Sequence, residues 1–426
     1  MLETMFSLKR FSKEEKSWIM YDWANSVFAT IMVAAIFPVF FMVMAGGEGT
    51  QGSVWWAAGL MVSRLIVGIC APLVGAIIEY KGYKKKLFVI FLSIGLFATL
   101  ITAFMNTWET LLIGYIIANM FWSFCNQIYD AFLPDVTTKD KMDDVSASGF
   151  GWGYIGGSTI PFLISVVLLI VSGMEPWAIR ASVIMTAVWW GIFSIPIIRN
   201  VHHKHEESIP KGILKQSFKN VFYTAKKIAK NKAVLFFIVA YFFYIDGVGT
   251  VINMATAFGS ELGLDATGMI AALFVTQIVA FPFSIFFGFL AKKYNPVNVI
   301  IGSIIMYCFI CILGFIMAFG LEEYWFGYDI ALIMFWTLAF LVGTVQGGIQ
   351  AISRSIYGRL IPAEESGDYF GFFEIFGRFS AILGPGIYAA ILASTGRASF
   401  AIVGIIVLFF VGLFILLLNK KKIVFE

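Results

Sequence analysis

Charged and amide side chains interrupt stretches of this sequence that are otherwise long and apolar. Asp22 and Asn25 stand in the string YDWANS at residues 21–26, and Asp246 lies among glycines seven residues before Asn253. A carboxylate near the bilayer centre costs roughly 2.5–3.5 kcal/mol on insertion scales, so it is retained only where it faces protein or water. Such carboxylates can exchange protons, and amides can bind a polar solute. These residues therefore indicate a polar path through a membrane.

Fourteen such residues lie at least one turn inside apolar stretches, and most fall into two chemical groups. Acids and a neighbouring arginine suit proton coupling or gating, and this group is Asp22, Asp130, Asp246, Glu374 and Arg378. A guanidinium and amides suit the binding of a polar solute, and this group is Arg64, Asn25, Asn119, Asn253, Gln277, Gln346 and Gln350. Asn126 and Gln127 complete the fourteen.

Structural alternatives exist for several of these residues. Asp22 and Asp130 could cap helices or bond to a nearby Arg or backbone group instead of forming an inner gate or proton site. Arg64 could bind a substrate carboxylate or phosphate, or it could form a permanent ion pair with a buried acid. Glu374 precedes Arg378 by four residues, the favourable order for an intrahelical pair. That pair could instead exchange partners between two states.

The composition predicts a polytopic membrane protein. Hydrophobic residues make up 60% of the chain and charged residues only 13%, and the mean hydropathy is +0.86. Apolar runs of about 20 residues, each enough to cross a bilayer, fall near 18–44, 54–79, 87–106, 109–133, 146–173, 178–198, 233–258, 266–291, 297–319, 328–355, 368–394 and 398–419. We therefore expect twelve helices in two sets of six, with residues 1–198 and 233–426 as halves.

Positive charges predict the orientation of these helices. With loops assigned alternately to the two sides, 26 of the 30 Lys and Arg residues fall on the side of the N-terminus, among them Arg354 and Arg359. Only Arg180 and Arg397 fall on the other side. This asymmetry places both termini in the cytoplasm. The first apolar run is too long for a signal-peptide core, so we expect it to remain in the chain.

The long connection at residues 199–232 predicts an interfacial helix. Leu214, Phe218 and Phe222 recur at helical spacing, and lysines such as Lys215 and Lys219 supply a basic side. This pattern fits a helix in the headgroup region that is attracted to anionic lipid, although a linker with solvated lysines is the alternative. His202, His203 and His205 begin the connection, and a solvated loop is a better interpretation than a metal site because no further His or Cys is near.

The loop between the second and third runs carries a recognisable motif. It reads GAIIEYKGYKKK from Gly75 to Lys86 and resembles the G-x-x-x-D-R-x-G-R-[KR] loop of the major facilitator superfamily. Gly75 permits close helix packing, Glu79 can pair with a helix end, and Gly82 allows a tight turn before Lys84. The matching loop of the second half keeps Gly288 and loses the acid. We therefore expect an asymmetric gating loop.

Four longer strings carry a more specific resemblance. They are YDWANSVFAT, YDAFLPDV, QGGIQAISRSIYGRLIP and YFGFFEIFGRFSAILGP, in this order along both halves. Together they resemble the autophagy-related vacuolar amino-acid effluxers and their bacterial relatives, a branch of the major facilitator superfamily. The resemblance implies an all-α membrane protein, a twelve-span secondary transporter, with amino-acid efflux known for fungal members.

The sequence thus predicts a transporter that moves a small polar, amino-acid-like solute by alternating access, either proton-coupled or facilitative. Asp246 and Arg64 are the central candidates because both lie mid-span. The alternatives are a carrier of amphiphilic or lipid-like compounds and a channel or scramblase. An enzyme is not expected, because no phosphate-binding loop or in-span Ser-His pair is present. We expect no cofactor, metal or nucleic-acid partner, and a monomer in the cell membrane that contacts lipids.

Overall fold

A computed structural model of the chain describes residues 6–45, 50–264, 266–379 and 383–423. Twelve helices in this part of the chain are long and apolar enough to cross a membrane, which confirms the predicted number. Regular structure in the described residues is helical, apart from one isolated bridge between Tyr80 and Glu207. Helices dominate because a chain in hydrocarbon must satisfy its backbone hydrogen bonds within each span.

The first six spans are built from twelve elements. They are α2 (Lys13–Phe28), η2 (Ala29–Ala34) and α3 (Ile36–Met44); α4 (Thr50–Ile78); α5 (Tyr83–Thr102); α6 (Trp108–Ala131), followed by the short α7 (Leu133–Val136); α8 (Met142–Trp152), η3 (Gly153–Thr159) and α9 (Ile160–Val171); and α10 (Pro176–Phe193) with α11 (Ile195–Asn200). We call these elements the N-terminal half.

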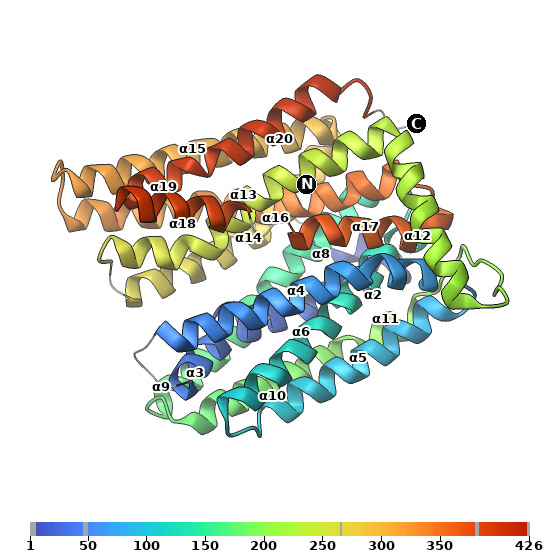
Figure 1. Cartoon of the computed structure of the whole chain (residues 1–426), viewed down its shortest axis with the longest axis horizontal. Helices are drawn as coiled ribbons and strands as arrows, with labels where there is room; N and C mark the ends of the chain where they lie inside the picture. The colour runs from blue at the N-terminus through green and yellow to red at the C-terminus, as the bar shows by residue number, and fades with distance from the viewer. Residues whose placement is uncertain (1–5, 46–49, 265, 380–382, 424–426) are drawn as a thin grey trace.

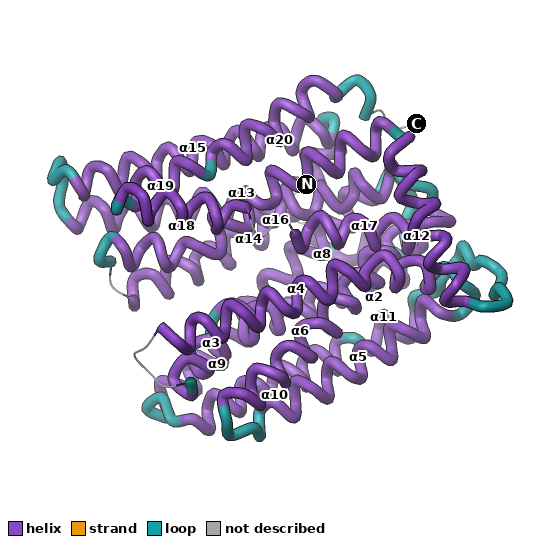
Figure 2. Tube along the Cα trace, in the orientation of Figure 1, coloured by secondary structure: helices purple, strands orange, loops and turns teal. Residues whose placement is uncertain are grey.

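The remaining spans follow α12 (Ile213–Lys230) in the chain. They are α13 (Lys232–Glu261); α14 (Ala266–Lys293); α15 (Pro296–Glu322); α16 (Tyr328–Leu360); α17 (Ser366–Phe379) with α18 (Leu383–Thr395); and α19 (Ala398–Gly404) with α20 (Ile406–Asn419). We call these elements the C-terminal half. Figure 2 shows the two groups of helices, with the longer loops at their ends and short breaks inside some spans.

The two halves meet at one end of the molecule. Figure 1 shows α12 running crosswise to the spans at this end, while the two groups of helices diverge toward the opposite end. Among the described residues, the extensive contacts between the halves join α4 to α17, and α8 to α14 and α16. Of these elements, α8 and α17 are the first portions of the fifth and eleventh spans, whereas α4, α14 and α16 each run the length of a span. We call the two ends of the bundle the α12 end and the far end.

The first and fifth spans of the N-terminal half each contain a π-helical segment. The π segment of each span packs against an α-helix of the other span. η2 widens the first span and η3 widens the fifth, where it packs on α2. Glycines make this approach possible, since a Cβ on Gly157 would lie 2.6 Å from the Ser26 side chain and 2.7 Å from the Trp23 carbonyl oxygen. Asp22, one residue before Trp23, is thereby held against the fifth span.

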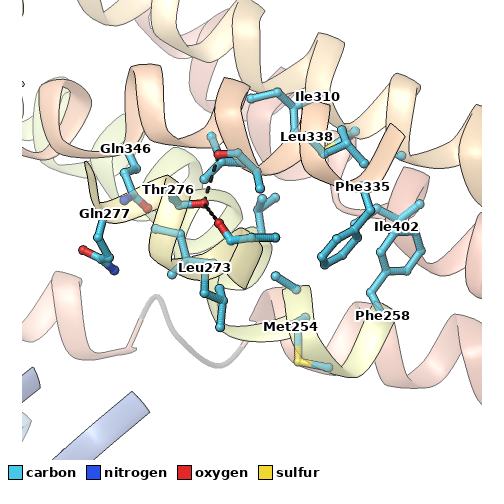
Figure 3. Close-up of a pocket in the computed structure, with 18 residues that line it drawn as sticks. Met254, Phe258, Leu273, Thr276, Gln277, Ile310, Phe335, Leu338, Gln346 and Ile402 are labelled. Atoms are coloured by element: carbon cyan, nitrogen blue, oxygen red, sulfur yellow. Dashed lines mark hydrogen bonds between the residues drawn. The ribbon is translucent and has the colours of Figure 1, made fainter. Parts of the chain in front are cut away.

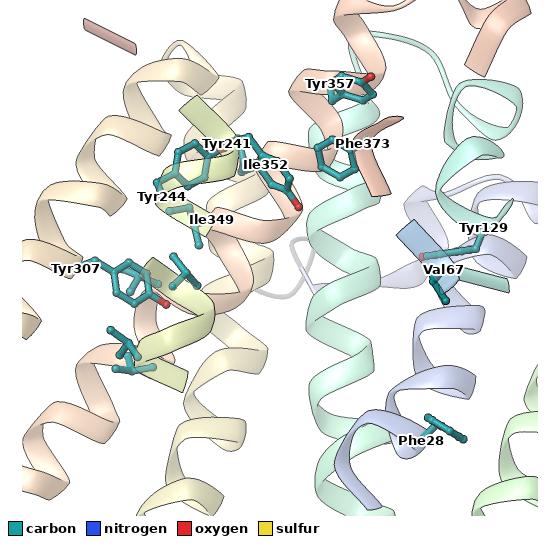
Figure 4. Packing of buried hydrophobic residues seen from close by; sticks show 14 of the residues in the cluster. Phe28, Val67, Tyr129, Tyr241, Tyr244, Tyr307, Ile349, Ile352, Tyr357 and Phe373 are labelled. Carbon is teal, nitrogen blue, oxygen red and sulfur yellow. The ribbon is translucent and has the colours of Figure 1, made fainter. Parts of the chain in front are cut away.

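Aromatic rings fill the interior of each half (Figure 4). In the C-terminal half, Phe373 stacks on Tyr241 and Tyr357 at centroid distances of 4.3 and 4.7 Å. In the N-terminal half, Trp18 stacks on Tyr129 at 4.2 Å. Such stacks bury a large apolar area and add about 0.5–1.5 kcal/mol per pair. They make each half a packed unit.

The connection between the halves differs from the solvated loop that we expected. The His203 side chain is only 2% exposed, and its Nε2 lies 3.7 Å from the Glu79 carboxylate. The segment is pulled inward because the Glu207 N–H donates to the Glu79 carbonyl oxygen and the Lys81 N–H donates to that of Glu207. The prediction of a solvated histidine loop is therefore wrong for His203.

Candidate functional site

A buried arginine from the C-terminal half joins three spans of the N-terminal half at the α12 end. Arg354 donates from Nη1 to Asp130 Oδ1 at 3.0 Å and from Nη2 to Asp22 Oδ2 at 3.3 Å. Its Nε donates to Ser146 Oγ at 2.9 Å. Arg354 is 3% exposed, so these are charge-assisted bonds away from water. We call Arg354, Asp22 and Asp130 the arginine cluster.

Aromatic rings hold the arginine cluster in place. The guanidinium carbon of Arg354 lies 4.6 Å from the centroid of Trp18 and 4.5 Å from that of Phe150. The Tyr129 hydroxyl donates to Asp22 Oδ2 at 2.7 Å. Ring faces attract a guanidinium, and the tyrosine fixes one carboxylate. The cluster contains two acids and one base, so one negative charge remains that a bound proton would neutralise.

Arg354 was not among the residues predicted for the site. The apolar run that carries it was predicted to end at residue 355, and Arg354 and Arg359 were counted as loop charges, whereas α16 continues to Leu360 and both residues lie within it. The spacing of Gln346, Gln350 and Arg354 on one helical face was the signal that could have found it. Asp22 and Asp130, both predicted as candidates, lie together here, and the partner that they share comes from the other half.

A second buried cation lies beside α17. Lys84 Nζ donates to Asp135 Oδ2 at 3.0 Å, to Ser366 Oγ at 3.0 Å and to the Ala131 carbonyl oxygen at 3.3 Å. The Lys84 and Asp135 side chains are fully buried. This ion pair lies wholly within the N-terminal half, and only the Ser366 hydroxyl comes from the other half. We call Lys84, Asp135 and Ser366 the lysine cluster.

The predicted loop motif lies against the start of α17. A Glu79 carboxylate oxygen accepts the N–H of Gly367, so the acid satisfies a free donor at a helix N-terminus. A Cβ on Gly75 would overlap the Gly367 carbonyl oxygen, and Gly82 has a positive φ of 74°. The loop motif therefore contacts the C-terminal half through Gly75, the Glu79 carboxylate and the Lys84 ammonium.

Asp143 at the start of α8 bonds to the C-terminal half as well. It accepts from the Ser355 hydroxyl at 2.5 Å and pairs with Arg359. In the same region, Ser146 Oγ donates to the Ala351 carbonyl oxygen at 2.7 Å. Together with the arginine cluster, these bonds seal the α8–α16 contact. All three ion pairs here, which Arg354 makes with Asp22 and Asp130 and Arg359 makes with Asp143, cross between the halves.

Deeper in the bundle, the other charged candidates come together from both halves. Arg64 on α4 interacts electrostatically with Asp246 on α13 and with Arg378 on α17. Arg378 Nη2 pairs with Glu374 Oε1 at 2.6 Å, so the intrahelical pair predicted as one alternative is formed. Both Asp246 carboxylate oxygens accept the N–H of Gly384, each at 3.0 Å. Asp246 thereby caps the N-terminal end of α18. We call Arg64, Asp246, Glu374 and Arg378 the central charges.

The amide candidates separate into bonded and unbonded groups. Asn119 donates from Nδ2 to Ser63 Oγ at 2.8 Å, which ties α6 to α4 within one half. Gln350 donates to the Gln346 carbonyl oxygen at 2.9 Å, and Asn253 is exposed. Three of the amides predicted to bind solute keep a buried polar atom without a hydrogen-bond partner in the described part of the chain. They are Asn25 through Nδ2, Gln277 through Oε1 and Gln346 through Nε2.

Two of these amides border a pocket inside the C-terminal half. It has a volume of about 80 Å³ and is lined mainly by apolar residues of α13, α14, α15 and α16. Figure 3 shows Gln277 and Gln346 beside each other on one side of it, away from Phe258 and Ile402. A free acceptor and a free donor therefore lie next to an apolar space.

Comparison with known proteins decides the family. The family described as "Vacuole effluxer Atg22 like" matches residues 58–422. The chain belongs to this Atg22-like family. An uncharacterized MFS-type transporter, YxiO of Bacillus subtilis, is 40% identical over 420 residues, which cover 96% of this chain and 95% of that protein. The resemblance to the vacuolar effluxers and their bacterial relatives is thereby confirmed.

Fungal relatives are more distant. Autophagy-related protein 22-1 of Aspergillus fumigatus is 27% identical over 300 residues, which cover 64% of this Atg22-like chain and 47% of the fungal protein. The chain thus matches about half the length of that relative. Any property of the whole fungal protein comes to this chain only as a proposal.

Solved structures show the fold. FucP, a major facilitator superfamily transporter in the outward conformation, superposes with a TM-score of 0.72 at 12% identity over 98% of this chain and 99% of that chain. The proton:xylose symporter XylE has a TM-score of 0.69 at 10% identity and covers 97% and 95% of the two chains. The Atg22-like chain therefore has the major facilitator fold. It is a multi-pass membrane transporter of this superfamily and not an enzyme.

Proposed function

We propose that this transporter moves a small zwitterionic, amino-acid-like solute by alternating access, with proton coupling. The observation that carries the proposal is the electrostatic attraction between Arg64 on α4 and Asp246 on α13, because it acts between a cation of one half and an anion of the other. A zwitterion presents both charges, so its carboxylate can bind a guanidinium while its ammonium binds an acid. The solute would then bridge the two halves.

The contacts at the α12 end support alternating access. The two halves are joined there and diverge at the far end (Figure 1). With the α12 end in the cytoplasm, as the loop charges predict, this arrangement is open outward. We propose that residues 1–198 and 233–426 rock as units about the central charges, connected by residues 199–232, in the cell membrane. The arginine cluster and the lysine cluster would then be the inner gate.

Asp246 tests the coupling. Asp246→Asn keeps the cap on α18 but removes the charge, so proton-driven accumulation of labelled amino acids into proteoliposomes should be lost. Exchange of solute at equal pH should persist but require a higher solute concentration, because the solute ammonium then meets an amide oxygen in place of a carboxylate. The matched control is Asp329→Asn, which makes the same change at an exposed residue near the start of α16. Unchanged accumulation by Asp246→Asn would exclude proton coupling through this residue.

Arg64 tests the substrate class. Losing a charge-assisted bond costs about 1.5–3 kcal/mol, so Arg64→Ala should weaken the solute about 10- to 100-fold in a thermal-shift titration against amino acids. Arg64→Lys should recover only part of this, because lysine lacks the planar fork. Arg199→Ala, a change at an exposed arginine, is the control. If the affinity for the transported solute is unaltered in Arg64→Ala, the zwitterion proposal fails.

A second candidate substrate class is supported by the pocket in the C-terminal half. An apolar space beside two unpaired amides suits an amphiphile with one polar group. The same titration with lysolipids and apolar amines separates the two classes. Leu338→Trp should fill the pocket and abolish binding of an amphiphile while leaving a zwitterion at Arg64 unaffected.

A further inference from the structure

The helix between the two halves has three distinct faces. One face is buried, with Ser217, Thr224 and Ile228 turned inward, and α12 packs on α4, α13 and α17. The helix lies crosswise to the spans, so it runs along the plane of a membrane rather than through it (Figure 1). Its other two faces therefore lie at the end of the bundle, where the spans emerge from the membrane into the headgroup region.

The second face of α12 is apolar and exposed. Leu214, Phe218 and Phe222 follow one another at four-residue spacing, and they are 62%, 55% and 71% exposed. Residues four apart lie on one side of a helix, so the three side chains form a continuous stripe. An exposed apolar stripe on a helix that is already packed on its other side indicates a further contact surface.

The third face of α12 is basic. Lys215, Lys219, Lys226 and Lys230 are exposed and lie along the helix next to the apolar stripe. Residues 211–232 contain no Asp or Glu. The exposed charge of this face is therefore not balanced within the segment. Lys227 does not belong to the row, because it pairs with Glu365.

We propose that α12 binds the anionic headgroups of the adjacent membrane leaflet, with its lysine row on phosphates and its apolar stripe at the boundary with the acyl chains. Charge complementarity favours this occupant, since Lys residues at the surface of an anionic membrane each strengthen binding about fivefold. The apolar stripe supplies the insertion that lysines alone lack. This inference does not depend on the proposed substrate, because it concerns only α12 and lipid.

The position of α12 gives lipid binding a structural consequence. The helix rests on α4 and α17, which are the two helices that join the halves on one side of the α12 end. Its Lys227 holds Glu365, immediately before α17 begins. Anionic lipid bound to α12 therefore stabilises the closed α12 end. The same lipid should protect the whole protein against heat.

Spin labels measure the depth of α12 directly. The probe protein carries Phe222→Cys, or Tyr223→Cys as the control at an exposed position about 100° farther round the helix, outside the apolar stripe, with the four native cysteines replaced by alanine. It is placed in vesicles of phosphatidylcholine alone or with 30% phosphatidylglycerol. We expect the label at residue 222 to be more accessible to oxygen than to a water-soluble nickel chelate when phosphatidylglycerol is present, and the label at 223 to show the reverse.

Other outcomes of the labelling would overturn the proposal. Equal access of the chelate to both labels in both vesicles would show that the stripe faces water. Immersion that is identical without phosphatidylglycerol would exclude recognition of anionic headgroups. Shielding of the label at 222 from both reagents would show a protein partner or a second copy of the chain on this face.

Thermal unfolding of the otherwise unchanged protein provides an independent measurement. Its Tm in lipid nanodiscs should rise when phosphatidylglycerol replaces part of the phosphatidylcholine, because a ligand bound to the folded state stabilises it. The variant with Lys215, Lys219, Lys226 and Lys230 changed to Gln should lose this rise. The control changes four other exposed lysines, Lys292, Lys293, Lys420 and Lys421, to Gln. Equal loss of the rise in both variants would contradict a specific role of α12.

Discussion

Two junctions close the α12 end, and they balance their charges in different ways. At the α4–α17 junction, the Lys84–Asp135 ion pair lies within the N-terminal half, and the C-terminal half contributes a hydroxyl and a backbone N–H. At the α8–α16 junction, the ions themselves come from opposite halves, since Arg354 binds Asp22 and Asp130. The α4–α17 junction can separate with its ion pair intact. Separation of the α8–α16 junction leaves Arg354 and the two carboxylates without their partners.

This difference assigns different roles to the two junctions. An unpaired buried ion is costly, so opening at α8–α16 requires something to replace the missing partner, such as a proton on a carboxylate or a solute charge. Opening at α4–α17 breaks neutral or charge-assisted hydrogen bonds that water can replace. We therefore assign the sensor role to the α8–α16 junction, which would respond to a bound proton or solute. The α4–α17 junction is a latch, in the sense that it only holds the halves together at the α12 end.

The largest effect is expected for Arg354→Ala. It leaves two carboxylates without their cation, and removal of one partner of a buried pair costs about 3–5 kcal/mol. Counterflow of labelled solute in proteoliposomes should fall at least about 100-fold. Arg354→Lys should remain strongly impaired, since a single ammonium cannot bridge both acids as the fork does. Near-normal counterflow in Arg354→Ala would remove the sensor role from this junction.

A smaller but still large effect is expected at the lysine cluster. Lys84→Met should destabilise the protein by about 3–5 kcal/mol, because Asp135 is left buried and charged. The double variant Lys84→Met with Asp135→Leu should recover most of this loss in Tm and should also transport. The double variant Arg354→Met with Asp130→Leu should recover only part of its loss in Tm, because Asp22 stays buried without its cation, and it should not transport. If both double variants transport equally, the two junctions do not differ in the way described.

The glycines of the two loops should differ by a moderate amount. A Cβ on Gly75 would overlap backbone oxygen of Gly367, whereas a Cβ on Gly288 would lie 2.9 Å from the Ala147 Cβ. Overpacking costs about 1–3 kcal/mol, so Gly75→Ala should lower Tm more than Gly288→Ala. Gly302→Ala is the control, because a Cβ there meets nothing within 4 Å. Equal losses at Gly75 and Gly288 would mean that the two loops pack alike.

The smallest effect concerns the connecting segment at the α4–α17 junction. Burial, and then the neighbouring Glu79 and Glu365, raise the pKa of Glu207 above 4.5. The folded protein thus keeps this proton where the unfolded chain has lost it, and stability falls as pH rises from about 4.5 through the raised pKa. Glu207→Gln should flatten this dependence and raise Tm at pH 7 by no more than about 1 °C, since the group is largely exposed. A lower Tm of Glu207→Gln than of wild type at pH 7 would contradict the destabilising role of this carboxylate.

The spans and the arginine cluster differ in how far the sequence could predict them. The twelve spans could be predicted from the lengths of the apolar runs, because each helix must by itself be long enough to cross the hydrocarbon layer. Asp22 and Asp130 were recognisable because a buried acid is expensive wherever it lies. Their common partner was not, since Arg354 is brought to them by contact between halves, which local hydropathy does not record. His203 was misjudged for the same reason, as its burial depends on Glu79, more than 100 residues away.

The π-helical segments give the first and fifth spans a property that ordinary helices lack. A π turn holds an extra residue, and such turns occur mostly as single bulges within α-helices. If η2 returned to α geometry, the portion beyond it would advance by about 1.5 Å and rotate by about 100°. α3 could thereby change which side chains it turns inward while α2 stayed fixed by Asp22. The first span can in this way act as two segments that rotate relative to each other, with the i→i+5 hydrogen bonds of η2 exchanged for i→i+4 bonds.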